Sequence, residues 1–318
     1  MTSSMSPPDP PRFERAEVFT TGGFPAQESW RVVREGRERA RLSLWWRHTP
    51  PWPGERLGTI GDLAAGDPRE ALPLLQWACE RLAQQGCRRV LAPMDGNSWG
   101  TYRCRLDAPL GFVGEPAPGP DWLPVLEACG FQLQSRYVSH RCDDLAWRRL
   151  PDRVQRRLAG LKILRGGALE APALLPRLHR LVMEAFAAQP WFLPLPSEAF
   201  AAAVRGRLGA EAGPFNWLAL DGEEPVGLLL AQRQQDQLVL RTLAVRPGHR
   251  FAGLGCLLLE LAHSAAAAVG CRSALHVLMQ DPGPSQRLSR HYGRPVARYG
   301  LLGRRLEPPA GPASPPPP

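Results

Sequence analysis

The residues from Val245 to Gly255, VRPGHRFAGLG, place an arginine and closely spaced glycines between two apolar runs. The run LVLRTLAV before them predicts a β-strand, and the run CLLLELAHSAAAAVG after them predicts a helix. The first turn of a helix carries unpaired backbone N–H groups and the positive end of the helix dipole, so it attracts anions. Glycines at Gly253 and Gly255 would let a phosphate approach that backbone closely. The junction therefore predicts a pyrophosphate site at the start of a helix that begins near Leu254.

Three classes of phosphate ligand use this arrangement, and two of them do not fit the residues. A P-loop needs a lysine and then a serine or threonine after its last glycine, whereas Cys256 follows Gly255. A dinucleotide-binding turn needs a third glycine, where this chain has Leu258, and an acidic residue about 20 positions further on. The next strand supplies no acidic residue before Asp281. Coenzyme A remains as the third candidate.

The spacing of the junction resembles the acyl-CoA motif of the GNAT acyltransferase superfamily, V-x-P-x-x-R-x-x-G-x-G. The matching positions are Val245, Pro247, Arg250, Gly253 and Gly255. The order of predicted elements over residues 161–306 is also similar to that family: two helices, three antiparallel strands, the glycine turn and helix, a strand, a short helix and a closing strand.

This resemblance implies how acetyl-CoA or another acyl-CoA would bind. The strand residues Leu243, Ala244 and Val245 would pair with the pantetheine arm. Backbone N–H groups of the turn would hold the pyrophosphate, and this set comprises Arg250, Phe251, Ala252, Gly253, Leu254 and Gly255. Arg246 and His249 would add positive charge.

The family reaction is attack of an amine on the thioester carbonyl. It needs no metal and no covalent enzyme intermediate, so Cys256 and Cys271 are interpreted as core residues.

The resemblance also implies a general acid, but this chain departs from the family pattern there. Many members carry a tyrosine in the short late helix, which protonates the leaving thiolate. In PGPSQRLSRHYGR, matching Ser285, Leu288 and Gly293 to the family positions places Ser289 where that tyrosine would stand. Tyr292 lies one turn further on, so Ser289 and Tyr292 are both candidates, and Tyr292 is also compatible with a packing role.

Two further features bear on the acceptor amine. His276 lies centrally in the strand SALHVLM and is a candidate general base, because imidazole titrates in the useful range. A core histidine in an apolar strand, with water as the base, is the alternative. Trp191 and Phe192 fall in the loop between the first two helices, where the family shapes its acceptor pocket. They would bind an apolar acceptor or fill the space between the helices.

The elements around these residues occur twice. The order helix, glycine, strand, loop, helix, strand appears in both halves of the chain, which indicates a tandem duplication. We predict an α/β (α+β) fold with two GNAT-like domains, each a mixed, mostly antiparallel sheet flanked by helices. The predicted ranges are a first domain over 12–145, a linker over 146–160, a second domain over 161–306, and disordered ends over 1–11 and 307–318.

The first half lacks the residues that would hold CoA. At the place of the glycine turn it reads GDLAAGDPREALPLL, where Asp62 and Asp67 would repel a pyrophosphate. The two leading helices are also missing, so we interpret this half as a degenerate GNAT-like domain. Its segment APMDGNSWGTYRCRL is polar and aromatic enough for an acceptor site or an inter-domain contact, and it is equally compatible with an ordered surface loop.

Composition limits the class of protein. The chain has 318 residues and a formal net charge of +9, but Lys162 is its only lysine and the arginines are scattered. We therefore do not expect nucleic acid as a partner. Seven cysteines without a C-x-x-C pair are typical of a reducing compartment. The start of the chain has no signal-peptide pattern, and no apolar stretch reaches the roughly 20 residues of a membrane span, so we expect a cytoplasmic protein without a membrane partner.

These observations favour an acyl-CoA-dependent N-acyltransferase whose partner is an amine of a small molecule or a peptide. The displaced tyrosine and the degenerate first half favour the alternative, a catalytically silent protein that binds CoA or acts as a scaffold. The acceptor, the acyl chain length and the oligomeric state stay open.

Overall fold

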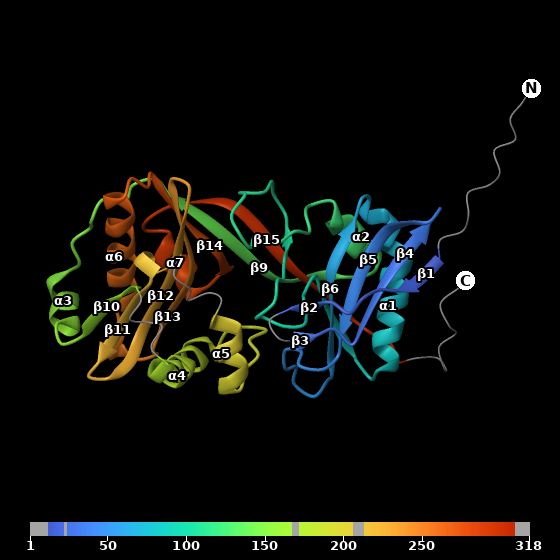
Figure 1. The fold of residues 1–318 in the computed structure, drawn as a ribbon, viewed down its shortest axis with the longest axis horizontal. Helices are drawn as coiled ribbons and strands as arrows, with labels where there is room; N and C mark the ends of the chain where they lie inside the picture. Colours follow the sequence, from blue (N-terminus) through green and yellow to red (C-terminus); the bar gives the residue numbers. More distant parts are fainter. Residues whose placement is uncertain (1–11, 22–23, 167–171, 206–212, 309–318) are drawn as a thin grey trace, which may run out of the picture. The chain divides into compact units, whose positions relative to one another are not determined.

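The computed structural model describes residues 12–21, 24–166, 172–205 and 213–308. The chain divides into two compact units (Figure 1). Unit 1 comprises residues 1–109, 114–135 and 300–318, and unit 2 comprises residues 110–113 and 136–299. The chain passes from unit 1 to unit 2 within strand β9 (Gln132–Cys142) and returns within strand β15 (Arg294–Arg305).

These units differ from the ranges 12–145 and 161–306 that the sequence predicts. The sequence pattern assigns each closing strand to the half that precedes it, whereas the contacts divide each of the two strands between both units. The predicted linker also contains a helix, α3 (Asp152–Leu158). The end segments predicted to be disordered lie almost entirely outside the described residues.

Unit 1 contains a sheet in the order β1-β4-β5-β6-β7 followed by the last residues of β15. Its pairs are antiparallel except for the parallel pair β6–β7. Its elements are β1 (Arg12–Arg15), β2 (Thr20–Thr21), β3 (Phe24–Pro25), β4 (Glu28–Arg34), β5 (Arg37–Trp45), β6 (Leu57–Ala65), η1 (Pro68–Ala71), α1 (Leu72–Gln84), β7 (Arg89–Ala92), β8 (Cys104–Arg105) and α2 (Trp122–Ala128).

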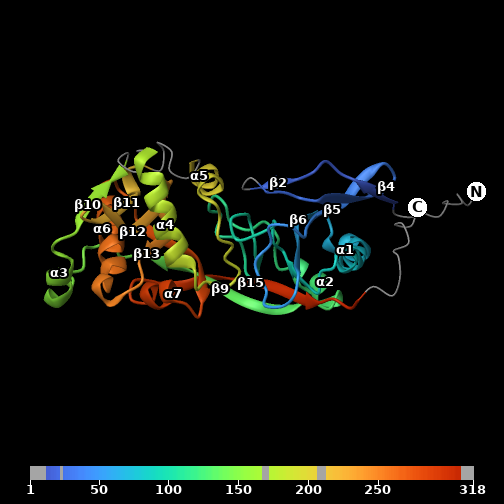
Figure 2. The same cartoon turned by 90° about the horizontal axis from the view of Figure 1, so that it is seen from below.

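Helices α1 and α2 lie on the same side of strands β4 and β5 (Figure 2). The buried positions of α1 follow helical spacing, and they are Leu74, Leu75, Ala78, Cys79 and Leu82. They form one core with side chains from α2 and from the strands. In the described part of unit 1, no helix precedes the first strand of the sheet, β1.

Unit 2 contains a sheet in the order β9-β14-β13-β12-β11-β10, in which only β13 and β14 run parallel. Its elements, besides α3 and the shared strands, are β10 (Lys162–Arg165), η3 (Pro172–Leu174), α4 (Leu175–Phe186), α5 (Ser197–Arg205), η4 (Gly213–Phe215), β11 (Trp217–Asp221), β12 (Glu224–Gln234), β13 (Gln237–Val245), η5 (His249–Phe251), α6 (Leu254–Ala268), β14 (Ser273–Asp281) and α7 (Pro284–Ser289). Both units are therefore mixed, mostly antiparallel sheets flanked by helices, as predicted.

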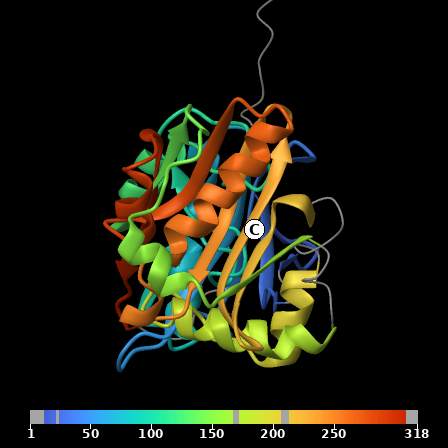
Figure 3. The ribbon, with the colours of Figure 1, turned by 90° about the vertical axis from the view of Figure 1, so that its left-hand side faces the viewer.

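Helix α6 crosses one face of strands β12 and β13, and α4 covers the opposite face (Figures 2 and 3). The close approach of α6 depends on Gly227 in β12, because a Cβ atom there would lie 2.7 Å from Leu254 Cδ2. Within the described residues, the helical stretch His249–Ala268 is long and apolar enough for a membrane span, contrary to the sequence estimate. Its residues Leu258 and Ala262 are buried in the core of unit 2, which is the ordinary position of a core helix.

In unit 1, the gap beyond the parallel strand pair is closed by the chain itself. Pairing of β6 with β7 ends at Thr59 and Leu91. Beyond it, Met94 N donates to Ile60 O at 2.8 Å, and Asp62 N donates to Asp95 Oδ1 at 2.7 Å. The Asp95 carboxylate also occupies the space where a Cβ atom on Gly61 would stand. The free edge of β6 is therefore filled before any ligand could pair with it.

The polar segment that follows β7 is packed into unit 1. Asn97 is buried and donates from Nδ2 to His48 O at 3.0 Å, while its Oδ1 accepts from Trp99 N at 2.9 Å. These bonds order the loop, and the role of this segment stays as open as the sequence leaves it.

Burial raises the pKa of Asp95 to about 6, above its ordinary value of 3.8. The Asp95 carboxyl therefore holds its proton more tightly in the folded protein than in the unfolded chain. Protonation of Asp95 stabilises the folded protein at low pH, and this stabilisation is lost as pH rises from about 4 to 6. Asp95→Asn keeps an acceptor for Asp62 N and removes the titration. We expect the wild type to lose about 3 kcal/mol of unfolding free energy relative to Asp95→Asn over this pH range. Urea unfolding from pH 4 to 7 measures the difference, and parallel curves for the two proteins would contradict this assignment.

Candidate active site

The site begins where strands β13 and β14 stop pairing. Their parallel pairs run from Gln237 and Ser273 to Leu240 and His276, and β13 then continues to Val245 without β14. A bulge in β14 follows His276, with Leu278 at a φ of 56°. The edge of β13 from Arg241 to Val245 is therefore not covered by β14, and its other edge pairs with β12. The predicted strand residues Leu243, Ala244 and Val245 all lie on this segment.

The glycine turn leads from β13 into the first turn of α6. Gly253 has a φ of 97°, a left-handed conformation that a side chain would strain. The first backbone bond of the helix runs from Leu257 N to Gly253 O at 3.1 Å, so the N–H groups of Leu254, Gly255 and Cys256 precede the hydrogen-bond ladder. This helix start is where the sequence predicts an anion site, and Phe251 and Ala252 precede it in the chain.

The predicted basic residues of the turn already have carboxylate partners. Arg250, which is 67% exposed, pairs through Nη2 with Asp221 Oδ1 at 2.6 Å. Arg246 Nε lies 3.0 Å from Glu184 Oε2, and its Nη2 lies 3.8 Å from Glu224 Oε2. Their charge is therefore partly balanced before an anion arrives.

A cation that the sequence analysis missed comes from the linker helix α3. Arg157 Nη1 donates to Ala252 O at 3.0 Å, which places its guanidinium beside the turn. From the same helix, Val154 packs against Gly253, since a Cβ atom on Gly253 would lie 2.5 Å from Val154 Cγ1. No local pattern in the sequence assigns Arg157 to the turn, and only the three-dimensional contact with Ala252 does so.

Behind the point where the strands part, three histidines and a serine form a buried hydrogen-bonded row. Ser289 Oγ lies 2.7 Å from His276 Nδ1 and 3.0 Å from His140 Nδ1, while His276 Nε2 lies 3.0 Å from His263 Nε2. All four side chains are at most 4% exposed. The structure thus brings the predicted residues Ser289 and His276 together and adds His140 from β9 and His263 from α6.

Burial keeps these imidazoles neutral. It lowers the pKa of His276 to about 3, helped by its neighbours His263 and His140, and it lowers the pKa of His263 to about 4. The pKa of His140 is also lowered by burial. A neutral imidazole has one donor and one acceptor nitrogen, so all the hydrogen bonds of the row must point in one of two directions. Reversing the direction of these hydrogen bonds moves one proton from one end of the row to the other and leaves no charge on any side chain within it.

Tyr292 lies beside this row rather than within it. Its ring centroid is 5.5 Å from that of His263, and the Arg148 guanidinium lies 5.1 Å from its centre. Burial and the neighbouring Glu260 carboxylate raise the pKa of Tyr292, so the phenol stays protonated. Glu260 is 1% exposed, and its Oε2 accepts from Arg148 N at 2.7 Å.

The remaining predicted residues lie elsewhere in unit 2. Trp191 and Phe192 are in the loop between α4 and α5, where Trp191 has a φ of 64° and the Phe192 ring centroid is 6.0 Å from that of Phe186. That loop follows α4, on the face opposite α6. Cys256 is half-buried and Cys271 is buried, and burial raises the pKa of both thiols, which does not favour a nucleophilic role.

Metal binding has no support in the part of the chain that the structure describes. There, no group of three or more His, Cys, Asp or Glu side chains is placed to hold a metal ion. The three histidines of the buried row are bonded in series and do not surround a common point.

Comparisons with known proteins agree with this geometry. Residues 176–293, all within unit 2, match the acetyltransferase (GNAT) family. A GCN5-related N-acetyltransferase from Sphaerobacter thermophilus is similar in structure, with a TM-score of 0.56 and 17% identity over 89% of this chain and 82% of that one. A tandem GNAT protein from the clavulanic acid biosynthesis pathway, solved without acetyl-CoA, gives a TM-score of 0.55 and 16% identity over 90% of this chain and 84% of that one. Residues 176–293 of unit 2 therefore match the GNAT family, and the fold of the chain is similar to that of GNAT N-acetyltransferases, a tandem GNAT protein among them.

Proposed function

We propose that this protein is an acetyl-CoA-dependent N-acyltransferase that acts on an amine of a small molecule or a peptide. The observation that carries the proposal is the uncovered edge of β13, Arg241–Val245, which leads through the glycine turn to the first turn of α6. A strand edge can pair with the amide groups of a pantetheine arm, and a helix start attracts a pyrophosphate. Unit 2 has both features in the required order.

Within this proposal, Leu243, Ala244 and Val245 pair with the pantetheine arm. The pyrophosphate is held by backbone N–H groups of the turn, and Arg157 of α3 adds positive charge beside Ala252. Arg250 contributes less than its motif position implies, because Asp221 already balances its charge. Bound acetyl-CoA would supply a thioester carbonyl, which the amine attacks with loss of the CoA thiolate.

We assign Ser289 as the proton donor to the departing sulfur. Its hydroxyl gives up one proton and takes another from an imidazole N–H, and each neighbour in the row repeats the exchange. The end of the row then takes up a proton, so the interior stays neutral throughout. A histidine with a pKa of about 3 is a weak base, so we assign His276 to orienting Ser289 and passing protons, and we leave deprotonation of the amine to water. Tyr292 supports the row through His263.

The catalytically silent alternative has its own support in the structure. The phenol of Tyr292 lies against Glu260, and the histidines are too weakly basic to store a proton. Under this alternative the protein would bind acetyl-CoA without releasing thiol in the presence of any amine.

We further propose a cytoplasmic, reducing location, which is supported by the seven cysteines, all of them free in this structure.

Replacing Gly255 with valine is expected to weaken acetyl-CoA binding by about tenfold or more, because the side chain would fill the space beside the uncovered edge of β13. A Cβ atom there lies 3.3 Å from Leu288 Cδ2 and 3.6 Å from Leu243 Cδ2, and both are side-chain ends that can shift, so the fold should survive. Isothermal titration calorimetry measures the affinity, and circular dichroism checks the fold.

Gly66→Val in unit 1 is the matched control. The backbone of Gly66 is not in the left-handed region, and no atom lies within 4 Å of the position that a Cβ atom would take there. Wild-type affinity is expected for this variant, with one acetyl-CoA per chain. Unchanged binding by a folded Gly255→Val protein would refute the assigned CoA site, and two bound molecules would refute the degenerate status of unit 1.

Replacing Ser289 with alanine is expected to lower kcat for thiol release by about 100-fold while leaving acetyl-CoA affinity unchanged. Ser289→Thr keeps a hydroxyl and should recover most of the rate. The control is Ser273→Ala, since the Ser273 hydroxyl is buried and has no hydrogen-bond partner in the described residues. Thiol release over a panel of amines gives the rates.

Because His276 is already neutral above about pH 5, its titration should leave no inflection in the wild-type rate from pH 5.5 to 8. A Ser289→Ala protein with the wild-type rate would exclude Ser289 as the donor. Silence of the wild type despite tight acetyl-CoA binding would favour the alternative function.

A further inference from the structure

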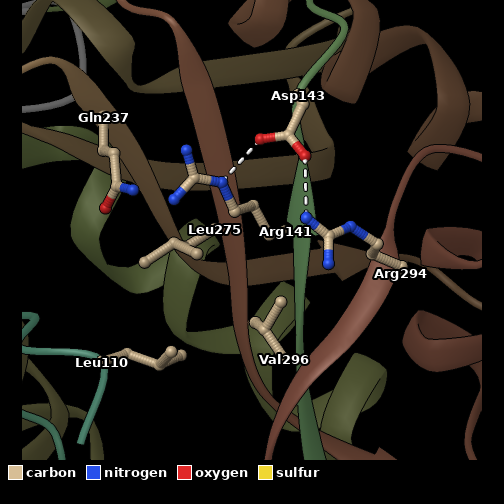
Figure 4. Close-up of a pocket in the computed structure, with 7 residues that line it drawn as sticks. All are labelled: Leu110, Arg141, Asp143, Gln237, Leu275, Arg294 and Val296. Atoms are coloured by element: carbon tan, nitrogen blue, oxygen red, sulfur yellow. Dashed lines mark hydrogen bonds and ion pairs between the residues drawn. The ribbon is translucent and has the colours of Figure 1, made fainter.

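A cavity of about 310 Å³ is lined by residues of β9, β13, β14 and β15 and by Leu110 (Figure 4), and it lies on the face of β14 opposite the histidine row. Successive residues of a strand point to opposite faces, so Leu275 lines this cavity while His276 joins the row. Arg141 of β9 is the cross-strand partner of Leu275 and points to the same side. The cavity is therefore separate from the residues assigned to acetyl-CoA.

Arg141 is held in place by a carboxylate at the rim. Its Nε donates to Asp143 Oδ1 at 2.5 Å, and Asp143 Oδ2 lies 3.5 Å from Arg294 Nη2. These two guanidinium groups lower the pKa of Asp143, the hydrogen bond from Arg141 contributing most, so Asp143 is ionised at neutral pH. The Arg141 guanidinium is thereby oriented before a ligand arrives.

The terminal nitrogens of Arg141 are turned toward the cavity. Figure 4 shows them on the side of Gln237, away from Asp143. Within the described residues neither terminal nitrogen has a hydrogen-bonded acceptor, because the hydrogen bond and ion pair of Arg141 with Asp143 use Nε. Two parallel N–H groups on one guanidinium match the two oxygens of a carboxylate, and the Gln237 amide can donate a further bond.

The opposite wall of the cavity is aliphatic and firmly packed. It is formed by Leu110, Leu275 and Val296. Leu275 is 2% exposed and shares a buried cluster with Phe112 and Val277. This wall can pack against a short hydrocarbon chain, but it has no polar side chain that could bind a second charged group.

The segment that carries Leu110 is fastened to the sheet of unit 2. Gln234 Nε2 donates to Gly111 O at 2.8 Å and its Oε1 accepts from Val113 N at 3.0 Å, and Arg241 Nη1 also donates to Val113 O. The aliphatic wall therefore exists before a ligand binds, which reduces the ordering cost of binding.

We propose that this cavity binds a small aliphatic monocarboxylate, with its carboxylate on the terminal nitrogens of Arg141 and its hydrocarbon chain against Leu275 and Val296. Two guanidinium groups and one carboxylate give the lining a net charge of +1, which matches a monoanion better than a phosphate. A volume of 310 Å³ is about ten times that of one water molecule, enough for a chain of about six carbons. The proposal goes beyond the acyltransferase function and does not depend on acetyl-CoA binding.

The test uses 4-methylpentanoate as the probe with the full-length protein, and measures binding by ligand-observed NMR and isothermal titration calorimetry. We expect saturable binding of the acid, with 4-methylpentan-1-ol and inorganic phosphate at least about tenfold weaker. Arg141→Gln should weaken binding of the acid by about tenfold or more, and Asp143→Asn should weaken it several-fold by releasing Arg141.

Arg272→Gln is the matched control, because Arg272 belongs to another surface ion pair, with Asp236, and is not part of the cavity. It should bind the acid like the wild type. Circular dichroism checks that each variant is folded, and an unfolded Arg141→Gln protein would be replaced by Arg141→Lys, which keeps the charge but loses the paired N–H groups. Equal binding of the acid and the alcohol, tighter binding of phosphate, or a folded Arg141 variant with wild-type affinity would each overturn the proposal.

Discussion

The end of hydrogen bonding between β13 and β14 at Leu240 and His276 is the constraint on which the site in unit 2 depends. A bulge in β14 turns that strand away, and Leu278 N donates to Ser139 Oγ at 3.1 Å, which holds the bulge in place. The uncovered edge of β13 follows from this divergence. The approach of α6 to the same region follows from Gly227, where a side chain would collide with Leu254.

Unit 1 contains an equivalent parallel strand pair, but the gap beyond that pair is filled. There the strands β6 and β7 also stop pairing, at Thr59 and Leu91, but the chain returns across the gap. The Asp95 carboxylate accepts from Asp62 N at 2.7 Å and brings a partly buried charge to the position where a pantetheine amide would pair. A repeated fold therefore does not repeat a binding site, since the side chains that enter the gap decide whether it stays open. This agrees with the family match falling in unit 2 alone.

Local signals in the sequence were enough for most elements and for the glycine turn, although they missed helix α3 in the predicted linker. Helical spacing predicted α4 and α6, and Gly253 marked a turn that only a glycine adopts without strain. The partners of the site residues were not predictable in this way. His140 and His276 face each other only because β9 and β14 pair in register, and no local pattern records a pairing between residues so distant in the chain. The same holds for Asp221, which balances the charge of Arg250, and for the division of the two closing strands between the units.

The buried row of histidines limits the chemistry that unit 2 can perform. Four polar side chains without charge can lie in an apolar core because each has a hydrogen-bond partner, whereas a charged imidazole there would lose its hydration without a counter-ion. The row can therefore orient Ser289 and exchange protons along its length, but it cannot store one. A base that must hold the proton of an ammonium group has to lie outside this row. The mechanism that we propose therefore divides the two proton movements, with donation to sulfur on the face of α6 and α7 and removal from the amine in contact with solvent.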